Sequence, residues 1–159
     1  MTDPRYTLTQ DDFPKDGLQF SETRRSLPMA LLMAREAVME RFRPMLHALE
    51  LTEQQWRVLR VLQESPGSDA TLLARKACIL APSLTRMLKA LEARTLITIA
   101  RDPSDARRMI LSLSEEGHAL LKGAAQDSAR LYGEIETAIG RERLHHLLDE
   151  IEALLDRLE

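Results

Sequence analysis

A regular hydrophobic stripe lies between residues 82 and 93. Leu84, Leu88 and Leu91 recur at the spacing of an α-helix, so one face of this segment is predicted to be buried. Pro82 suits the first helical position, where its missing N–H has no partner to lose. The opposite face carries small hydroxyls and long cations, namely Ser83, Thr85, Arg86 and Lys89. Such groups hydrogen-bond phosphate oxygens and base edges.

After this helix the hydrophobic pattern changes to a period of two. Apolar residues alternate over 97–99 and again over 109–113, on either side of a polar turn at 101–106. This pattern predicts an antiparallel hairpin, with Arg107 and Arg108 at its tip. A helix with a polar outer face followed by a basic-tipped hairpin is the layout of a winged helix-turn-helix. Such a module places the helix in a major groove and the tip near an adjacent minor groove.

Helical patterns surround this unit and predict a mainly α protein. A long helix is expected at about 27–49, with a bend at Pro44. Thr52 opens the next helix with a capping box that Gln55 completes. The remaining helices are expected at about 71–77, at about 115–139 with Ser114 as its hydroxyl cap and Gly140 as its stop, and over the leucine-rich stretch 144–158. We expect an N-terminal arm at 1–25 and a single domain at 26–159, with the winged helix-turn-helix at about 51–113 and dimerisation helices at about 27–49 and 115–158.

The last predicted helix is rich in leucine along one side. Its apolar positions are Leu144, Leu147, Leu148, Ile151, Leu154, Leu155 and Leu158. A helix with this stripe needs a partner surface, and the long helix at 27–49 and the helix that begins at Glu115 supply part of it. A second subunit is expected to supply the rest, so the sequence predicts a homodimer.

Composition fits a soluble globular domain dominated by helices. Of the 159 residues, 44% are hydrophobic, 30% are charged and 4% are aromatic. No apolar run approaches the roughly 20 residues that span a bilayer. The N-terminus lacks a signal-peptide pattern. The single cysteine allows no internal disulfide. We therefore expect a cytoplasmic protein without a membrane partner.

The net charge of −3 is distributed in a way that favours a nucleic-acid partner. From Thr71 to Arg108 there are eight basic residues and three acids, which gives +5 in this segment and −8 elsewhere. The alternative is a solvated charge run. The sequence has no glycine-rich phosphate loop, nucleophile elbow, paired Cys-x-x-Cys or His-Glu-x-x-His, so we expect no enzyme activity and no cofactor.

The order of these elements resembles the MarR family of bacterial transcription regulators. The segment Asp102-Pro-Ser-Asp105-Ala-Arg107-Arg108 and the exit Leu111-Ser-Leu113-Ser-Glu-Glu-Gly117 resemble that family's D-x-R wing. Three blocks, at 30–37, 51–57 and 77–85, resemble more specifically the group that represses homoprotocatechuate (hydroxyphenylacetate) degradation genes. The resemblance covers about residues 27–140. It implies a dimeric repressor that reads a pseudo-palindromic operator in double-stranded DNA.

The resemblance also implies roles for individual residues. The major groove would be met by Pro82, Ser83, Thr85, Arg86 and Lys89. Arg107 would enter the minor groove, held by a charge-assisted bond from Asp105, with Arg108 beside it. The alternative for Ser83 and Thr85 is helix capping. For the cations together, DNA contact is the favoured interpretation.

One position departs from the family pattern. The family usually has glycine after the recognition helix, and this sequence has Thr95 there. A β-branched residue is poor in a left-handed helix cap. We therefore expect this helix end to be built differently, without loss of the wing.

The resemblance further implies a site for a small aromatic carboxylate of the hydroxyphenylacetate type. Arg35 lies in an apolar helical turn and would bind the carboxylate, because a cation there is costly unless it is paired. The aromatic wall would come from Met39, Phe42 and Trp56, with His47 or Arg60 as a further polar contact. The alternative is a salt bridge between Arg35 and a nearby acid, with Trp56 as ordinary core.

Other chemistries are less favoured by the sequence. Cys78 lies in an apolar turn, so packing is favoured over a peroxide-sensing role. His145 and Asp149 are four residues apart, but His146 has no evident partner, and no metal site is predicted. Two alternative functions remain open. One is the same regulator triggered by oxidation or by another phenolic or acyl-CoA ligand. The other is a winged-helix interaction module that does not bind DNA.

Overall fold

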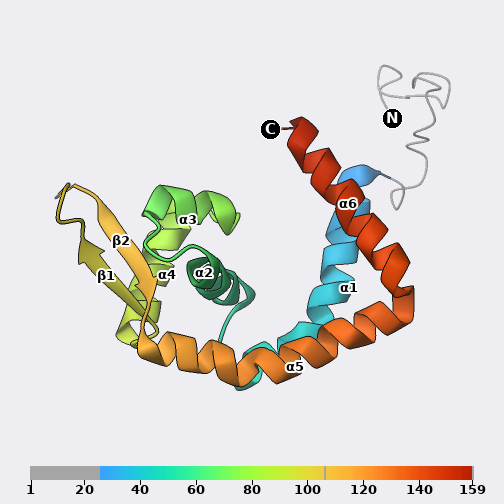
Figure 1. Ribbon diagram of the computed structural model, residues 1–159, viewed down its shortest axis with the longest axis horizontal. Coiled ribbons are helices and arrows are strands. Elements are labelled where there is room, and N and C mark those ends of the chain that lie inside the picture. The colour runs from blue at the N-terminus through green and yellow to red at the C-terminus, as the bar shows by residue number, and fades with distance from the viewer. Residues whose placement is uncertain (1–25, 106, 159) are drawn as a thin grey trace, which may run out of the picture. The chain divides into compact units, whose positions relative to one another are not determined.

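The computed structural model describes residues 26–105 and 107–158 (Figure 1). In chain order the elements are α1 (Leu27–Ala48), α2 (Glu53–Glu64), α3 (Ala70–Lys76), α4 (Ala81–Ala93), β1 (Ile97–Arg101), β2 (Met109–Leu113), α5 (Glu115–Ile139) and α6 (Arg141–Leu158). The chain divides into two compact units, 1–41 and 42–159, with the boundary inside α1. The predicted arm at 1–25 lies outside the described residues.

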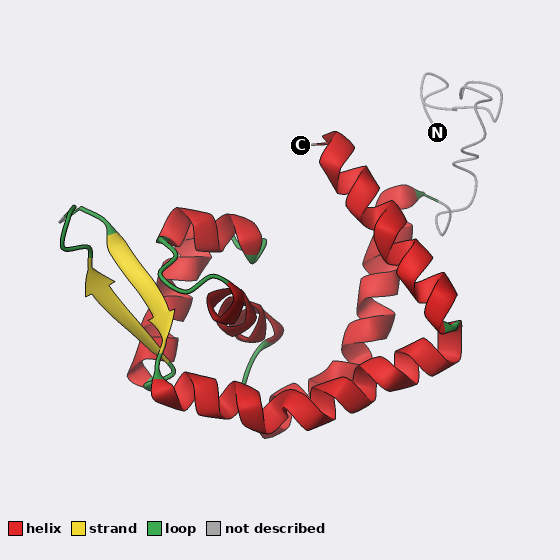
Figure 2. Cartoon of the chain, viewed as in Figure 1, coloured by secondary structure: helices red, strands yellow, loops and turns green. Residues whose placement is uncertain are grey.

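This order confirms the predicted fold class, mainly helical with a two-stranded wing (Figure 2). The predicted capping box is present: Thr52 Oγ1 accepts from the Gln55 N–H at 3.2 Å, and Gln55 Oε1 accepts from the Thr52 N–H at 2.9 Å. The helix α1 continues through Pro44. Pattern and capping rules therefore located the elements well.

The second unit contains a hydrophobic core formed by α2, α3, α4 and the hairpin. Val58, Leu59 and Leu73 are fully buried, and the predicted stripe of α4 is buried as well. The strands pair antiparallel, with Ile97 opposite Leu113 and Ile99 opposite Leu111. The predicted alternation is thus correct, and it fixes which face of the hairpin packs on the core.

Three helices end in a left-handed residue that is not glycine. Glu50, Cys78 and Thr95 have φ of 53°, 50° and 58°. After α4, the Thr95 N–H donates to the Glu92 carbonyl at 2.8 Å and the Leu96 N–H donates to the Leu91 carbonyl at 3.0 Å, which is a Schellman motif. The expectation of a different helix end at Thr95 is therefore wrong. Burial of Leu96 in the core forces the chain through this turn even without glycine.

The strain at Thr95 gives a testable stability effect. We expect Thr95→Gly to raise the free energy of unfolding by about 1 kcal/mol, because a left-handed conformation costs a non-glycine residue roughly that much. Thr98→Gly in β1 is a matched control that should lower stability, since glycine weakens a strand. Urea unfolding of both variants measures the difference. A Thr95→Gly protein less stable than the parent would contradict this explanation.

The helix α6 leaves much of its apolar side exposed. None of its described residues is buried, and Leu147, Leu148, Leu155 and Leu158 are 48%, 49%, 54% and 74% exposed. No described helix combines the length and apolar character needed to cross a membrane. Burying this leucine surface would be strongly favourable, so α6 presents a surface suited to association.

Candidate DNA interface and ligand groove

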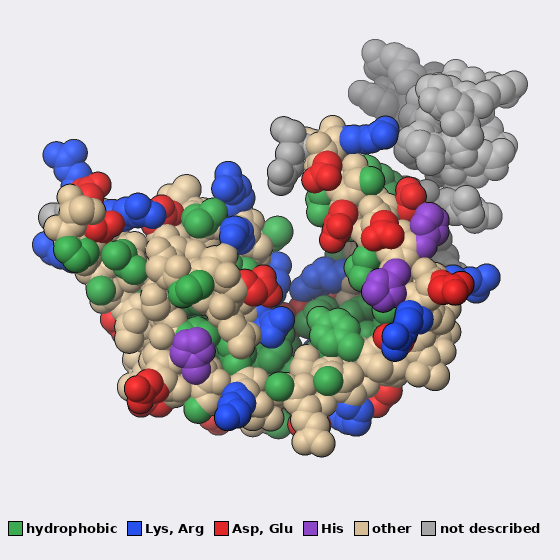
Figure 3. Space-filling view, in the orientation of Figure 1, with side chains coloured by type: hydrophobic (Ala, Val, Ile, Leu, Met, Phe, Trp, Pro, Cys, Tyr) green, Lys and Arg blue, Asp and Glu red, His purple; other side chains and the backbone are tan. Residues whose placement is uncertain are grey.

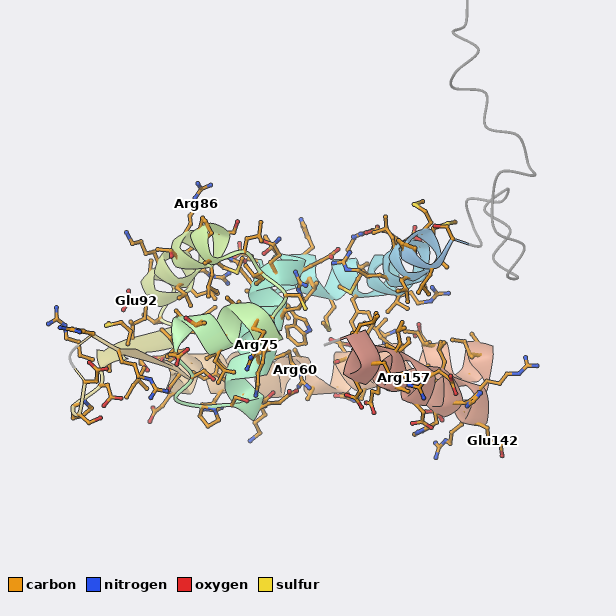
Figure 4. All side chains as sticks on the ribbon, turned by 90° about the horizontal axis from the view of Figure 1, so that it is seen from above. Arg60, Arg75, Arg86, Glu92, Glu142 and Arg157 are labelled. Atoms are coloured by element: carbon orange, nitrogen blue, oxygen red, sulfur yellow. The ribbon has the colours of Figure 1, made fainter. Side chains whose placement is uncertain are left out.

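The outer face of α4 is exposed and carries the predicted polar residues. Pro82, Ser83, Thr85, Arg86 and Lys89 all have exposed side chains, while Leu84, Leu88 and Leu91 are buried. Figure 4 shows the Arg86 side chain extending outward from α4. The Thr85 hydroxyl donates to the Ala81 carbonyl at 3.3 Å, one helical turn back. The helix therefore presents hydroxyls and cations on one continuous face.

A hollow of about 380 Å³ lies between this face and the start of α2. It is lined by Thr52, Gln54, Gln55, Pro82, Ser83, Arg86, Met87 and Ala90. Sequence reasoning did not assign Gln54 and Gln55 to the interface. The available signal was their place in the first turn of α2, which the Thr52 cap defines. Their amide NH2 groups can donate to phosphate oxygens or to acceptors on base edges.

The turn of the hairpin is organised by two aspartates. The Asp102 carboxylate accepts from the hydroxyl and the N–H of Ser104 at 2.6 and 2.8 Å. Both bonds lower the pKa of Asp102 from its ordinary value because they stabilise the ionised form. The bond from the Ser104 hydroxyl has the larger effect, followed by the bond from the Ser104 N–H. Asp105 accepts from the backbone N–H of Arg107 at 3.0 Å. The expected bond to the Arg107 guanidinium is in the structure a bond to its backbone.

Asp105 therefore fixes the backbone of the tip and leaves the Arg107 side chain to extend from it. Arg107 and Arg108 are both exposed. Figure 3 shows Lys and Arg side chains gathered at the end of the hairpin, with acidic side chains beside them. Arginine at an exposed tip of this kind suits insertion into a narrow, electronegative minor groove.

Three of the eight basic residues between Thr71 and Arg108 make internal contacts. Lys76 Nζ donates to the Ser65 hydroxyl at 2.7 Å. Arg108 forms an ion pair with Asp69, the N-cap of α3, at 3.4 Å. Arg94 donates to the carbonyls of Leu49 and Glu50 at 3.1 and 2.5 Å, just beyond the end of α1. Arg108 thus tethers the wing to α3, and Arg94 ties the end of α4 to the end of α1. Because these cations make contacts within the chain, less positive charge faces outward.

A groove of about 620 Å³ lies between α2 and α5. It is lined by Trp56, Arg60, Gln63, His118, Leu121, Lys122, Ala125, Ser128, Ala129 and Tyr132. The structure thus brings two predicted effector residues, Trp56 and Arg60, into one cavity. Sequence reasoning missed the α5 side, although Lys122, Ala125, Ala129 and Tyr132 follow helical spacing on one face of α5.

The other predicted effector residues have different surroundings. Phe42 is buried and meets Tyr132 edge to face, with ring centroids 5.1 Å apart. His47 lines a separate hollow with Glu50 and Leu51. Arg35 pairs with Glu36 at 3.2 Å, and its side chain is 43% exposed. That pair is the alternative considered for Arg35. Met39 is half-buried.

Cys78 does not pack into the core. Its side chain is exposed, so the packing interpretation is wrong. The reason is its place as the left-handed residue after α3, where the next residue, Ile79, takes the buried position instead. Within the described part of the chain, no cluster of three or more His, Cys, Asp or Glu could hold a metal ion.

Known proteins resemble this chain in sequence and in fold. The MarR family model matches residues 51–109. The homoprotocatechuate degradative operon repressor of Escherichia coli is 46% identical over 132 residues, which cover 81% of this chain and 89% of that protein. The chain belongs to the MarR family. The predicted resemblance to the homoprotocatechuate repressor group is also confirmed.

Two solved structures that are similar to this MarR-family chain contain a bound partner. NadR in complex with 4-hydroxyphenylacetate is 40% identical, with a TM-score of 0.75, and the match covers 84% of this chain and 94% of NadR. The repressor CouR bound to a 23-mer DNA duplex is 33% identical, with a TM-score of 0.77, and the match covers 87% of this chain and 98% of CouR. One relative was thus captured with an aromatic acid and another with DNA.

Proposed function

We propose that the protein is a homodimeric repressor that binds operator DNA in the cytoplasm and leaves it when a small aromatic carboxylate binds. The observation that carries the DNA-binding half is the exposed, basic face of α4 beside an arginine-tipped wing. CouR, with a similar fold, is bound to a DNA duplex in its structure. In this proposal α4 enters the major groove and Arg107 the minor groove.

The leucine surface of α6 supports the dimer. Four of its leucines are 48% to 74% exposed in the single chain. A second copy can cover them with its own apolar surface, as a two-fold symmetric interface requires. Two recognition helices would then lie about one duplex turn apart, or roughly 34–36 Å, and read a pseudo-palindrome.

The groove between α2 and α5 is the proposed effector site. Its volume suits a ligand of this size. Trp56 and Tyr132 supply flat walls, while Arg60 and Lys122 supply positive charge for a carboxylate. We assign the carboxylate to Arg60 in place of Arg35, since Arg60 lines the groove and Arg35 does not belong to its lining. Arg60 also pairs with Glu64 at 3.5 Å and donates to Gln63 at 3.0 Å, so the ligand carboxylate would share this guanidinium. NadR binds 4-hydroxyphenylacetate, which has the carboxylate and phenol that this lining suits.

Release follows if the ligand favours a dimer whose recognition helices are wrongly spaced. The ligand shifts the population only as far as it binds that form better than the DNA-competent one. By linkage, bound DNA must then lower the affinity of the protein for the ligand by the same factor. The contact of Arg94 with the end of α1 offers one physical connection between the long helix and α4.

The effector assignment predicts a loss of ligand affinity in Arg60→Ala. Removal of a charge-assisted bond to a carboxylate should weaken 4-hydroxyphenylacetate binding roughly 10- to 100-fold. Trp56 is the only tryptophan in the chain and lines the groove, so its fluorescence reports binding directly. Arg75→Ala on α3, outside the groove lining, is the control and should bind as the parent does. If Arg60→Ala binds the ligand as tightly as the parent does, Arg60 does not bind the carboxylate, and Lys122→Ala is the next variant to measure.

A gel shift tests the whole proposal. The duplex is an operator selected from a random pool, with 4-hydroxyphenylacetate and homoprotocatechuate titrated in. Binding that either acid reverses supports both halves. Binding that neither acid reverses supports the DNA-binding half of the proposal and rejects these two acids as effectors. Because Cys78 is exposed, a peroxide-treated sample and Cys78→Ser test the oxidation alternative. Failure to select any duplex at low salt would contradict DNA binding.

A further inference from the structure

The residue at the start of α4 is a leucine whose side chain makes no cap bond and is not buried. Leu80 is the N-cap of α4, with extended backbone angles and no side-chain cap bond. In α2, α3 and α5 the N-caps are Thr52, Asp69 and Ser114, and each accepts a bond from a first-turn N–H. Leucine has no atom that can accept such a bond, so it leaves α4 less stable than serine or aspartate would.

Nor does burial explain this leucine. Its side chain is 79% exposed, the highest value among the large hydrophobic residues of the described chain. The buried position of this turn belongs to Ile79, which is only 7% exposed. Leu80 therefore neither caps the helix nor contributes to the core. A partner that approaches the start of α4 is what could use an apolar side chain here.

The position of Leu80 indicates which partner that is. Side chains three residues apart lie on neighbouring positions of a helical turn, which puts Leu80 beside Ser83 at the start of the exposed face. Ala81 and Pro82 are exposed as well, and Arg86 follows one turn later. In a major groove, the group that an aliphatic side chain contacts is the 5-methyl of thymine.

We propose that Leu80 is a specificity-determining residue that packs against the 5-methyl group of one thymine in each operator half-site. This inference rests on the DNA-binding function proposed above and adds to it. The contact removes two apolar groups from water, and cytosine, which lacks the methyl, cannot make it. A serine or aspartate at the same position would cap α4 but would lose this discrimination.

Uracil substitution tests the contact, because uracil differs from thymine only by the methyl group. Each thymine of the selected operator is replaced by uracil, symmetrically in both half-sites, and the affinities of the parent, Leu80→Ala, Leu80→Met and Leu80→Ser proteins are measured. When uracil replaces the contacted thymine, the operator affinity of the parent should fall about fourfold per half-site, or roughly 15-fold for both half-sites. This is the loss expected when one methyl group is no longer buried. Leu80→Met keeps an apolar side chain and should retain most of the parent's affinity.

The decisive readout is the coupling between protein and base. Leu80→Ala and Leu80→Ser should bind the thymine operator weakly and should lose little more on the uracil operator, so that the two losses are not additive. Leu80→Ser should also raise the melting temperature by about 2–4 °C through its new cap. That rise separates a loss of contact from a loss of folding.

Three outcomes would overturn the inference. One is an unchanged operator affinity in Leu80→Ala, and another is a Leu80→Ala loss that adds to the uracil loss at every thymine. In either case the parent still binds its operator, so the DNA-binding proposal stands and only the role of Leu80 fails. If the parent protein selects no duplex, the proposed function and this inference fail together.

Discussion

Gly117→Ala is expected to lower the melting temperature by about 10 °C. Gly117 is buried in the first turn of α5, and a Cβ there would lie 2.1 Å from the carbonyl oxygen of Leu96. The Leu96 carbonyl is backbone and cannot rotate away as a side chain could, so overpacking of this kind should cost about 3 kcal/mol or more. For a chain of this size, each kcal/mol shifts the melting temperature by roughly 2–4 °C.

The close approach at Gly117 has a structural purpose. The Leu96 carbonyl accepts from the Ser114 N–H at 3.2 Å, and the Ser114 hydroxyl accepts from the Gly117 N–H at 2.9 Å while donating to the Thr95 carbonyl. These bonds hold the start of α5 against the turn that joins α4 to β1. A methyl group at Gly117 would separate them, and α4 and the wing would lose a shared support.

Gly123→Ala is the matched control for Gly117→Ala. Gly123 lies further along α5, and a Cβ there would meet nothing within 4 Å. Alanine is the better helix former by about 1 kcal/mol, so this variant should be more stable than the parent. Differential scanning calorimetry on both proteins gives opposite signs if the contact explains the effect. A Gly117→Ala protein as stable as the parent would show that α5 can shift without cost.

The sequence predicted the elements well because each rests on a local signal. The stripe of Leu84, Leu88 and Leu91 identified the buried face of α4, and the alternation of the strands identified the hairpin. The caps at Thr52 and Ser114 marked helix starts through bonds that span only three residues. These interactions are local, so a single sequence contains them.

Helix ends were less predictable. The rule that glycine follows a helix fails at Glu50, Cys78 and Thr95, which all adopt the left-handed conformation. The Schellman bonds form there because the residue that follows each of them is buried, so tertiary packing outweighs the local strain. A local propensity cannot anticipate that balance.

Contacts between distant residues were also beyond sequence reasoning. Arg94 and Arg108 are among the eight basic residues that favoured a nucleic-acid partner, yet Arg94 donates to the carbonyls at the end of α1 and Arg108 pairs with Asp69. For the effector site, Trp56 and Arg60 were named, but Lys122 and Tyr132 were not. Pairing α2 with α5 needs the tertiary fold, because more than fifty residues separate the two faces.

Arg86→Ala is expected to produce the largest loss of operator binding. Arg86 extends outward from the centre of α4, and a bidentate arginine contact to a base is worth about 1–3 kcal/mol. A dimer loses two such contacts, so affinity should fall roughly 100-fold or more. The loss should depend on the base at one position of each half-site, and affinity for non-specific DNA should fall much less.

Arg107→Ala at the wing tip should behave differently, and the comparison with Arg86→Ala separates the two roles. If each Arg107 neutralises one of the phosphates that border the minor groove, loss of both copies should lower the slope of log affinity against log salt by about 1.8. Arg130→Ala on α5, where Arg130 pairs with Glu134 at 2.7 Å, removes the same charge elsewhere and should change neither affinity nor slope. Fluorescence anisotropy from 50 to 200 mM salt measures all three variants. Unchanged binding in both Arg86→Ala and Arg107→Ala would reject α4 and the wing as the DNA-binding surface.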